Sequence, residues 1–220
     1  GPTPVLVSDE GVFDLLSVAP TLSGLLAMDD PAAAALGGKG VRLGDVEAML
    51  ANSAHNNQDP DQSYFLAPAD LQALKACGVT FVSSMLERVI EEQAKGDPDK
   101  AAEIRDAIGA EIGQSLADIT PGSEEAARVK AVLEEQGLWS QYLEVGIGPD
   151  AEVFTKSQPM AAVGMGAEIG IHPKSTWNNP EPEIVLAIAP DSRVVGACLG
   201  NDVNLRDFEG RSALLLGKAK

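Results

Sequence analysis

Two apolar runs near the end of the chain constrain its fold most strongly. Residues 183–189 form the first run and residues 193–200 the second, and Pro190-Asp191-Ser192 lies between them. Two such runs around a short turn predict an antiparallel hairpin. In a hairpin, the start of the first strand lies beside the end of the second. Polar residues at these two positions are therefore expected to meet.

Three carboxylates occupy these positions. Glu181 and Glu183 are two residues apart and so point to one face of the first strand, while Pro182 between them marks an edge or a strand start. Asp202 follows Asn201 at the end of the second strand. Like charges this close repel, so a proton, an Arg or Lys side chain, or a divalent cation must compensate them. The alternative is a solvated strand end at the surface.

The residue types favour a hard cation. Carboxylate oxygens suit Mg²⁺, with Mn²⁺ or Ca²⁺ as alternatives. The cluster contains no histidine, which argues against Zn²⁺. His172 lies on an earlier expected strand, where we expect a structural role.

Composition restricts the partners. The chain has 220 residues, of which 45% are hydrophobic, and 33 Asp and Glu against 16 Lys and Arg give a formal charge of −17. This surplus disfavours nucleic acids and anionic membranes. No apolar stretch is long enough to span a bilayer and no signal peptide is visible, so we expect a cytoplasmic protein. Cys77 and Cys198 lie in apolar stretches and are expected to be buried, reduced thiols.

Hydrophobic periodicity predicts three regions. Residues 4–16 are typical of a hairpin, residues 19–30 and 43–52 have helical spacing, and residues 53–63 are the best candidate linker. Helices are then expected over residues 82–95, 99–117 and 123–136, the last capped by Ser123. Short β-rich runs follow at 142–148, 151–156, 167–173, 182–188 and 193–203, and residues 207–220 turn helical. The β-rich runs predict a mostly antiparallel β-domain.

The carboxylate hairpin resembles the fumarylacetoacetate hydrolase family. PEPEIVLAI resembles its paired-glutamate strand, and GNDVNLRD its Asn-Asp-x-x-x-Arg-Asp signature. FTKSQPMAAVGMGAEIGIHP resembles its Phe-x-Lys segment and Gly-rich turn, and GVTFVSSMLE the opening of its catalytic domain. The resemblance covers about residues 66–220.

The resemblance implies an α+β fold: a mixed β-roll with a helical insertion and a small N-terminal domain. The N-terminal domain would span residues 1–62, and residues 63–220 would be the first part of a catalytic domain that continues beyond this chain. It also implies a homodimer, a small-molecule 2-oxo acid substrate, and Mg²⁺ on Glu181, Glu183 and Asp202. Lys156 and Arg206 would bind the substrate.

One branch of the family matches best. Ser84 stands where many family hydrolases carry a histidine, whereas Glu87 is kept, and the two would share a helical face. The stretch GLWSQYLEVGIGPDAEVFTK, the helical insertion before it and GNDVNLRDFEGRSALLLGKAK resemble the branch that converts 2-keto-3-deoxy-pentonates to 2,5-dioxopentanoate, which implies a lyase. Glu87, Ser84 and Lys220 would be the catalytic residues, with Lys218 as the alternative to Lys220.

Two other functions stay open. One is an acylpyruvate hydrolase or oxaloacetate decarboxylase of the same family with a changed base. The other is a protein without catalysis that only binds 2-oxo acids. The missing histidine fits this last function equally well, whereas Glu87 favours the dehydratase.

Overall fold

The computed structural model describes residues 1–78, 90, 94, 97–112, 119–135, 137, 139–212, 215 and 217. Most of the helix expected over 82–95 lies outside the described residues. The chain divides into two compact units, Gly1–Leu74 with Thr155–Lys220, and Lys75–Phe154. Strand β4 (Leu74–Cys77) leads out of the first unit and its partner β5 (Val153–Ser157) leads back. The domain boundary at residue 62 stays a prediction.

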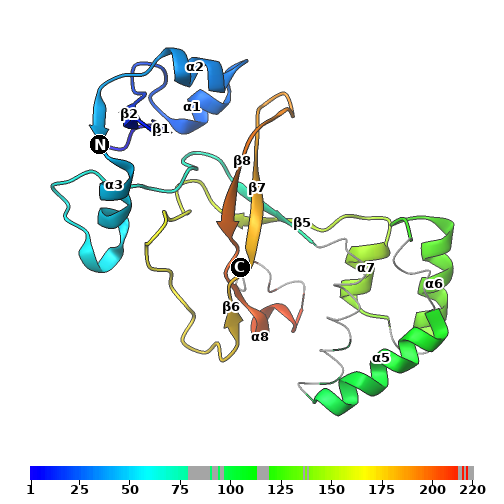
Figure 1. Cartoon of the computed structure of the whole chain (residues 1–220). Helices are drawn as coiled ribbons and strands as arrows, with labels where there is room; N and C mark the ends of the chain where they lie inside the picture. The colour runs from blue at the N-terminus through cyan, green and yellow to red at the C-terminus, as the bar shows by residue number, and fades with distance from the viewer. Residues whose placement is uncertain are drawn as a thin grey trace. The chain divides into compact units, whose positions relative to one another are not determined.

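The N-terminal hairpin is confirmed. Strands β1 (Val5–Ser8) and β2 (Gly11–Asp14) pair antiparallel, and β3 (Arg42–Gly44) adds to the other edge of β2 (Figure 1). Gly11 has φ +121°, and a Cβ there would lie 2.7 Å from the carbonyl oxygen of Gly44. The turn therefore requires glycine.

Three helices and one 3₁₀ turn belong to the same region. They are α1 (Leu22–Leu26), α2 (Pro31–Gly37), α3 (Val46–Ser53) and the 3₁₀ turn η1 (His55–Asn57). The helical predictions for 19–30 and 43–52 are thus confirmed in type, whereas α2 was not anticipated. The core of this region consists of Leu15, Ala19, Leu25 and Ala35.

Asp70 caps helix α1 from a distant part of the chain. Its carboxylate accepts hydrogen bonds from the backbone N–H groups of Leu22 (2.6 Å) and Ser23 (2.9 Å), and also from the Ser23 hydroxyl. Partial burial alone would raise the pKa of Asp70. The hydrogen bonds from Ser23, Leu71 and Leu22 outweigh it, so the pKa lies below its usual value.

Asp70→Ala is expected to lower the free energy of unfolding by about 1–2 kcal/mol at pH 7. Because the folded pKa is depressed, this contribution is complete above the unfolded pKa of about 3.9 and is lost as the pH falls through the folded pKa. The difference between parent and variant should therefore shrink in acid. Urea unfolding across this pH range measures it, with the exposed Asp61→Ala as control. A pH-independent difference would contradict the prediction.

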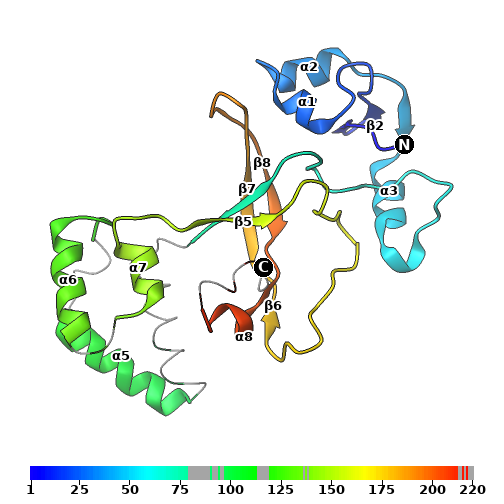
Figure 2. The same ribbon diagram turned by 180° about the vertical axis from the view of Figure 1, so that it is seen from behind.

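The described part of the second unit is mostly helical, apart from residues of β4 and β5 at its two ends. It contains α5 (Pro98–Ile112), α6 (Glu124–Glu135) and α7 (Gln141–Ile147). Helices were expected over 99–117 and 123–136, and α5 and α6 confirm them within the described residues. The Ser123 hydroxyl accepts from the N–H of Ala126 (3.1 Å), as the predicted cap requires. Figures 1 and 2 show α6 and α7 side by side.

Helix α7 corrects the strand expected over residues 142–148. Ser140 caps its start by accepting from the N–H of Leu143, and Gly148 ends it. Leu143 and Ile147 are four residues apart and each is 1% exposed, so one helical face buries both. Leu133 of α6 packs with Leu143 in this core. Burial of this helical face thus outweighs the strand preference of Tyr142, Val145 and Ile147.

The remaining strands belong to the first unit. They are β6 (Asn178–Asn179), β7 (Pro182–Ile188), β8 (Val194–Asn201) and β9 (Asn204–Leu205), followed by helix α8 (Arg206–Glu209). Strands β7 and β8 form the predicted hairpin, and α8 lies beside β6 (Figure 2). The strand predicted over 151–156 is confirmed as β5. Of the helix expected to residue 220, only residues 206–209, 215 and 217 are described as helical.

The strand expected over 167–173 is wrong, because this segment has no strand. The residue just before this segment bonds to another part of the chain: the carbonyl oxygen of Gly166, whose φ is +81°, accepts a hydrogen bond from the N–H of His55 (3.0 Å). A glycine in this conformation breaks an extended strand. The β-roll itself stays a prediction, since the described strands form four separate small sheets.

The expected burial of the cysteines is also wrong. Cys77 and Cys198 are free thiols, but both are exposed. Cys198 lies on β8, which in the described residues pairs only with β7, and apolar side chains of this hairpin such as Ile184 and Leu199 are 71% and 85% exposed. Apolar composition predicted burial, but the described chain places no second layer over this hairpin.

None of the described helices has the length and apolar character needed to cross a membrane.

Candidate metal centre

The centre forms where one antiparallel ladder is interrupted. Asn178 pairs with Leu205 in the ladder of β6 and β9, and Pro182 pairs with Asn201 in that of β7 and β8. The two ladders keep the same register, so no residue is inserted between them. Pro180 and Pro182 flank the interruption, and neither can donate a backbone hydrogen bond. The sequence therefore breaks the ladder at Glu181.

Side chains and backbone hold this break in place. The N–H of Glu181 donates to the side-chain oxygen of Asn201 (2.9 Å), and the N–H of Asp202 donates to the carbonyl oxygen of Glu181 (2.9 Å). Glu181 and Asp202 are thereby fixed opposite each other. This explains why an asparagine precedes the aspartate: its amide oxygen replaces a ladder acceptor.

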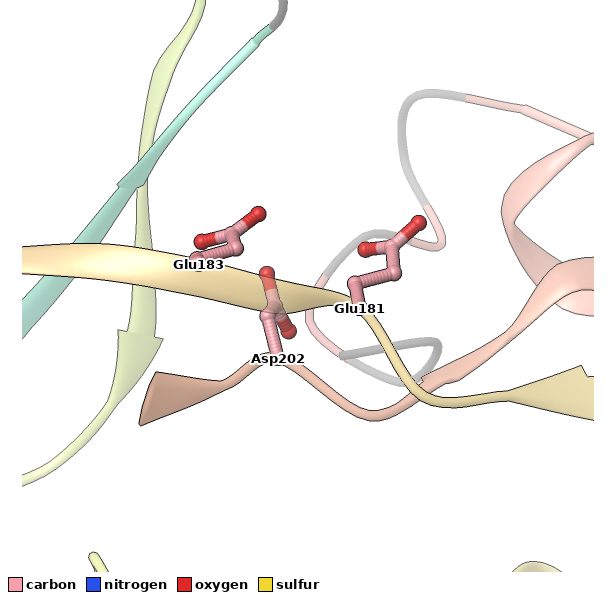
Figure 3. Close-up of side chains that lie close together, drawn as sticks. All are labelled: Glu181, Glu183 and Asp202. Carbon is pink, nitrogen blue, oxygen red and sulfur yellow. The ribbon is translucent and has the colours of Figure 1, made fainter. Parts of the chain in front are cut away.

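The predicted convergence of the three carboxylates is confirmed. Glu181, Glu183 and Asp202 each offer a carboxylate oxygen, and these oxygens lie within 4.8 Å of one another. Figure 3 shows Asp202 projecting from the neighbouring segment toward Glu181 and Glu183. Asp202 is buried, whereas Glu183 is exposed, so the cluster opens at one end.

Two cations flank the cluster. The Lys156 ammonium, from β5, pairs with Asp202 Oδ1 and donates to the carbonyl oxygen of Val203 (2.9 Å). The Arg206 guanidinium, from α8, lies 3.6 Å from Glu181 Oε1. Lys156 and Arg206 were predicted to bind substrate. The structure places both at the carboxylates, and their contact with a substrate stays a prediction.

Two buried residues of the centre were missed. Asn204 is fully buried and Glu209 is 8% exposed. The Asn204 amide donates to Glu181 (2.6 Å) and to Glu209 (3.2 Å), and Arg206 also donates to Glu209 (2.9 Å). The only sequence signal for Asn204 was its position two residues after Asp202, on the same strand face. Glu209 gave none, because its place depends on how α8 folds back.

The charge balance suits a divalent cation. Four carboxylates and two cationic side chains gather here, which leaves a formal charge of −2: Glu181, Glu183, Asp202 and Glu209 against Lys156 and Arg206. Carboxylate oxygens are the ligands that Mg²⁺ and Mn²⁺ prefer. The donor set and the charge thus both fit a hard divalent ion.

The three predicted catalytic residues cannot be placed. Glu87, Ser84 and Lys220 all lie outside the described residues, as does Lys218. Their roles stay predictions from the resemblance. The ring centroid of His172 lies 5.1 Å from that of Phe208, and its Nδ1 accepts from the N–H of Lys174 (3.1 Å); its structural role stays a prediction.

Lys156→Met is expected to destabilise the protein by about 3 kcal/mol in the absence of divalent ions, because the buried Asp202 loses its ammonium partner. Mg²⁺ should recover part of this loss, since a bound ion stabilises the folded state. Thermal unfolding with and without Mg²⁺ measures both effects. Lys174→Met, at an exposed lysine, is the control. Equal behaviour of the two variants would show that the pair contributes nothing.

The comparisons point to one class of enzyme. No family model and no solved structure matches the chain. The chain is 37% identical over 87 residues to a Haloferax volcanii protein named probable 2-keto-3-deoxyxylonate dehydratase. These 87 residues are 40% of this chain and 30% of that protein. The chain is also 33% identical over 69 residues to the 2-dehydro-3-deoxy-D-arabinonate dehydratase of Saccharolobus solfataricus, covering 31% and 23%. The matched part spans less than a third of either relative.

Proposed function

We propose that the chain belongs to a metal-dependent dehydratase of the fumarylacetoacetate hydrolase family that removes water from a 2-keto-3-deoxy-pentonate. The observation that carries this proposal is the convergence of Glu181, Glu183 and Asp202 at the interrupted hairpin. The names of the two relatives supply the substrate class. The mixed β-roll, the homodimer and the choice of Mg²⁺ are parts of the same proposal.

The chain's own residues would divide the work. Glu181, Glu183 and Asp202 would hold the ion, which when bound supplies a Lewis acid that favours loss of a proton beside a carbonyl. Lys156 and Arg206 offer the positive charge that a substrate carboxylate needs.

Proton transfer falls to residues outside the described part of the chain. Glu87 would take the proton from C3, with Ser84 beside it on the same expected helix. The C4 hydroxyl would then take up a proton and leave as water, which creates a C3–C4 double bond. Two proton shifts, from C5 to C3 and from the C5 hydroxyl to C4, would convert this unsaturated acid to 2,5-dioxopentanoate. Lys220 would be a further active-site group. A glutamate base acting on carbon fits a dehydratase better than a hydrolase, which must activate water.

The test is a substrate panel. The purified protein with Mg²⁺ is incubated with 2-keto-3-deoxy-pentonates, acylpyruvates and oxaloacetate, and the products are identified by mass spectrometry. Loss of water from a 2-keto-3-deoxy-pentonate, abolished by EDTA and restored by Mg²⁺, is the expected result. Turnover of an acylpyruvate or of oxaloacetate alone would replace the dehydratase by the hydrolase or decarboxylase. Binding of a 2-oxo acid without turnover would leave a non-catalytic protein.

A further inference from the structure

Glu209 and Glu181 share one hydrogen-bond donor, Asn204, and one ion-pair partner, Arg206. The Asn204 amide nitrogen contacts Glu181 Oε1 (2.6 Å) and Glu209 Oε2 (3.2 Å). One nitrogen of Arg206 lies 2.9 Å from the same Glu209 oxygen and 3.6 Å from the same Glu181 oxygen. Asn204 and Arg206 thus bridge one oxygen of each carboxylate. Glu209 itself is not in the three-carboxylate group.

This bridge lies in a buried setting. The side chains of Glu181, Arg206 and Glu209 are 15%, 16% and 10% exposed, and Asn204 is fully buried. The amide orientation of Asn204 is defined by chemistry, because its two partners are carboxylates and can only accept. Among the described residues, its oxygen has no hydrogen-bond partner. The amide is therefore held through its nitrogen, by Glu181 and Glu209 together.

Helix α8 is itself anchored, so Glu209 has a fixed position. Asp207 accepts hydrogen bonds from the Ser175 hydroxyl (2.8 Å) and from the N–H of Thr176 (3.0 Å). Phe208, 9% exposed, packs with Leu205 of β9. Arg206 and Glu209 are three residues apart and share one face of this helix. The anchored helix presents both side chains to Glu181 from behind the cluster.

We infer that Glu209 is a positioning residue of the metal centre: through Asn204 and Arg206 it holds the Glu181 carboxylate in the orientation that binds a divalent cation. The inference rests on the proposed cation site. Partners of this kind orient metal ligands in many proteins, and their loss typically costs about 10- to 100-fold in metal affinity. Glu209 touches neither the ion nor the substrate in this role.

Two substitutions separate positioning from charge. Glu209→Gln and Glu209→Leu remove the same negative charge, so any purely electrostatic loss of cation affinity is common to both. Only Gln can present an oxygen at the place of Glu209 Oε2, where it accepts from Asn204 and from Arg206. The difference in affinity between the two variants therefore reports positioning alone.

The experiment is a titration with Mn²⁺ alone, with free Mn²⁺ measured by electron paramagnetic resonance and folding checked by circular dichroism. Glu209→Leu is expected to bind Mn²⁺ about 10- to 100-fold more weakly than Glu209→Gln. Should Glu209→Leu fail to fold, Asn204→Ser takes its place, because a serine hydroxyl cannot reach both carboxylates. Because Asn204→Ser keeps the charge of Glu209, its reference is the parent protein, and we expect it to bind Mn²⁺ about 10-fold more weakly than the parent.

Each outcome decides one question. Suppose that the parent protein binds Mn²⁺. If Glu209→Leu then binds it as tightly as Glu209→Gln, or Asn204→Ser as tightly as the parent, the positioning role is overturned and the proposed function is left standing. A parent protein that binds no Mn²⁺ overturns the cation site, and the positioning role with it. A weaker leucine variant supports the inference even if no sugar acid is turned over, because the readout does not depend on catalysis.

Discussion

Glu183→Gln is expected to weaken Mg²⁺ or Mn²⁺ binding by more than about 100-fold and to remove nearly all activity. This loss exceeds the roughly 10- to 100-fold that is typical when a residue that only orients a metal ligand is replaced. The substitution keeps the shape of the side chain and removes one of three converging charges. Glu183 is exposed, so the amide needs no buried partner. The repulsion within the cluster also falls, and the free energy of unfolding should stay equal or rise slightly.

Glu181→Gln and Asp202→Asn should weaken cation binding about as much as Glu183→Gln does. Asp202→Asn should differ from Glu183→Gln in its effect on stability. Asp202 is paired with Lys156 in a buried setting, and an amide cannot neutralise the ammonium. Asp202→Asn should therefore lower the unfolding temperature in the absence of divalent ions, whereas Glu183→Gln should not. The effect of a substitution on cation affinity can thus be separated from its effect on stability within one cluster.

Isothermal titration with Mg²⁺ and thermal unfolding measure these effects. Glu168→Gln, the same substitution at a 72% exposed carboxylate that pairs with His55, is the matched control. It should bind the ion like the parent protein. If all three cluster variants did so too, the cluster would be a solvated strand end and the mechanism would fail.

The convergence of the carboxylates could be predicted from sequence because it depends mainly on local rules. The period of a strand places Glu181 and Glu183 on one face, and the hairpin brings the end of β8 beside the start of β7. A one-residue register shift between Ala187 and Ile188, which the sequence did not predict, then places Asp202 opposite Glu181. The same rules gave the hairpin of β1 and β2. Helix α2 was also within reach, since Asp30 and Pro31 form a recognisable cap and first turn.

The failures share a cause, which is dependence on packing between distant segments. Residues 142–148 are rich in strand-forming types, yet Leu143 and Ile147 bury one helical face against α6. Cys198 was expected to be buried because its strand is apolar, but burial requires a covering layer that periodicity alone cannot reveal. Glu209 was missed because only the return of α8 brings it behind Glu181, where Asn204 of β9 contacts both carboxylates.

Glu87→Gln is expected to lower turnover of a 2-keto-3-deoxy-pentonate by about 10²- to 10⁴-fold, the usual contribution of general acid–base catalysis. The amide keeps the size of the side chain and cannot accept a proton. Because Glu87 is not one of the proposed metal ligands, Mg²⁺ affinity should stay close to that of the parent protein. This separates the variant from Glu183→Gln, which should lose both.

Exchange of the C3 hydrogens with D₂O gives a second, more direct readout. If Glu87 removes the C3 proton, Glu87→Gln should suppress exchange in a slowly reacting substrate analogue, which nuclear magnetic resonance detects without product formation. Glu91→Gln, on the same expected helix, is the matched control and should leave exchange and turnover unchanged. Full turnover and exchange in Glu87→Gln would make the helix a scaffold and leave Lys220 as the next candidate base. Loss of turnover with normal exchange would instead move Glu87 to a later step, the departure of the C4 hydroxyl.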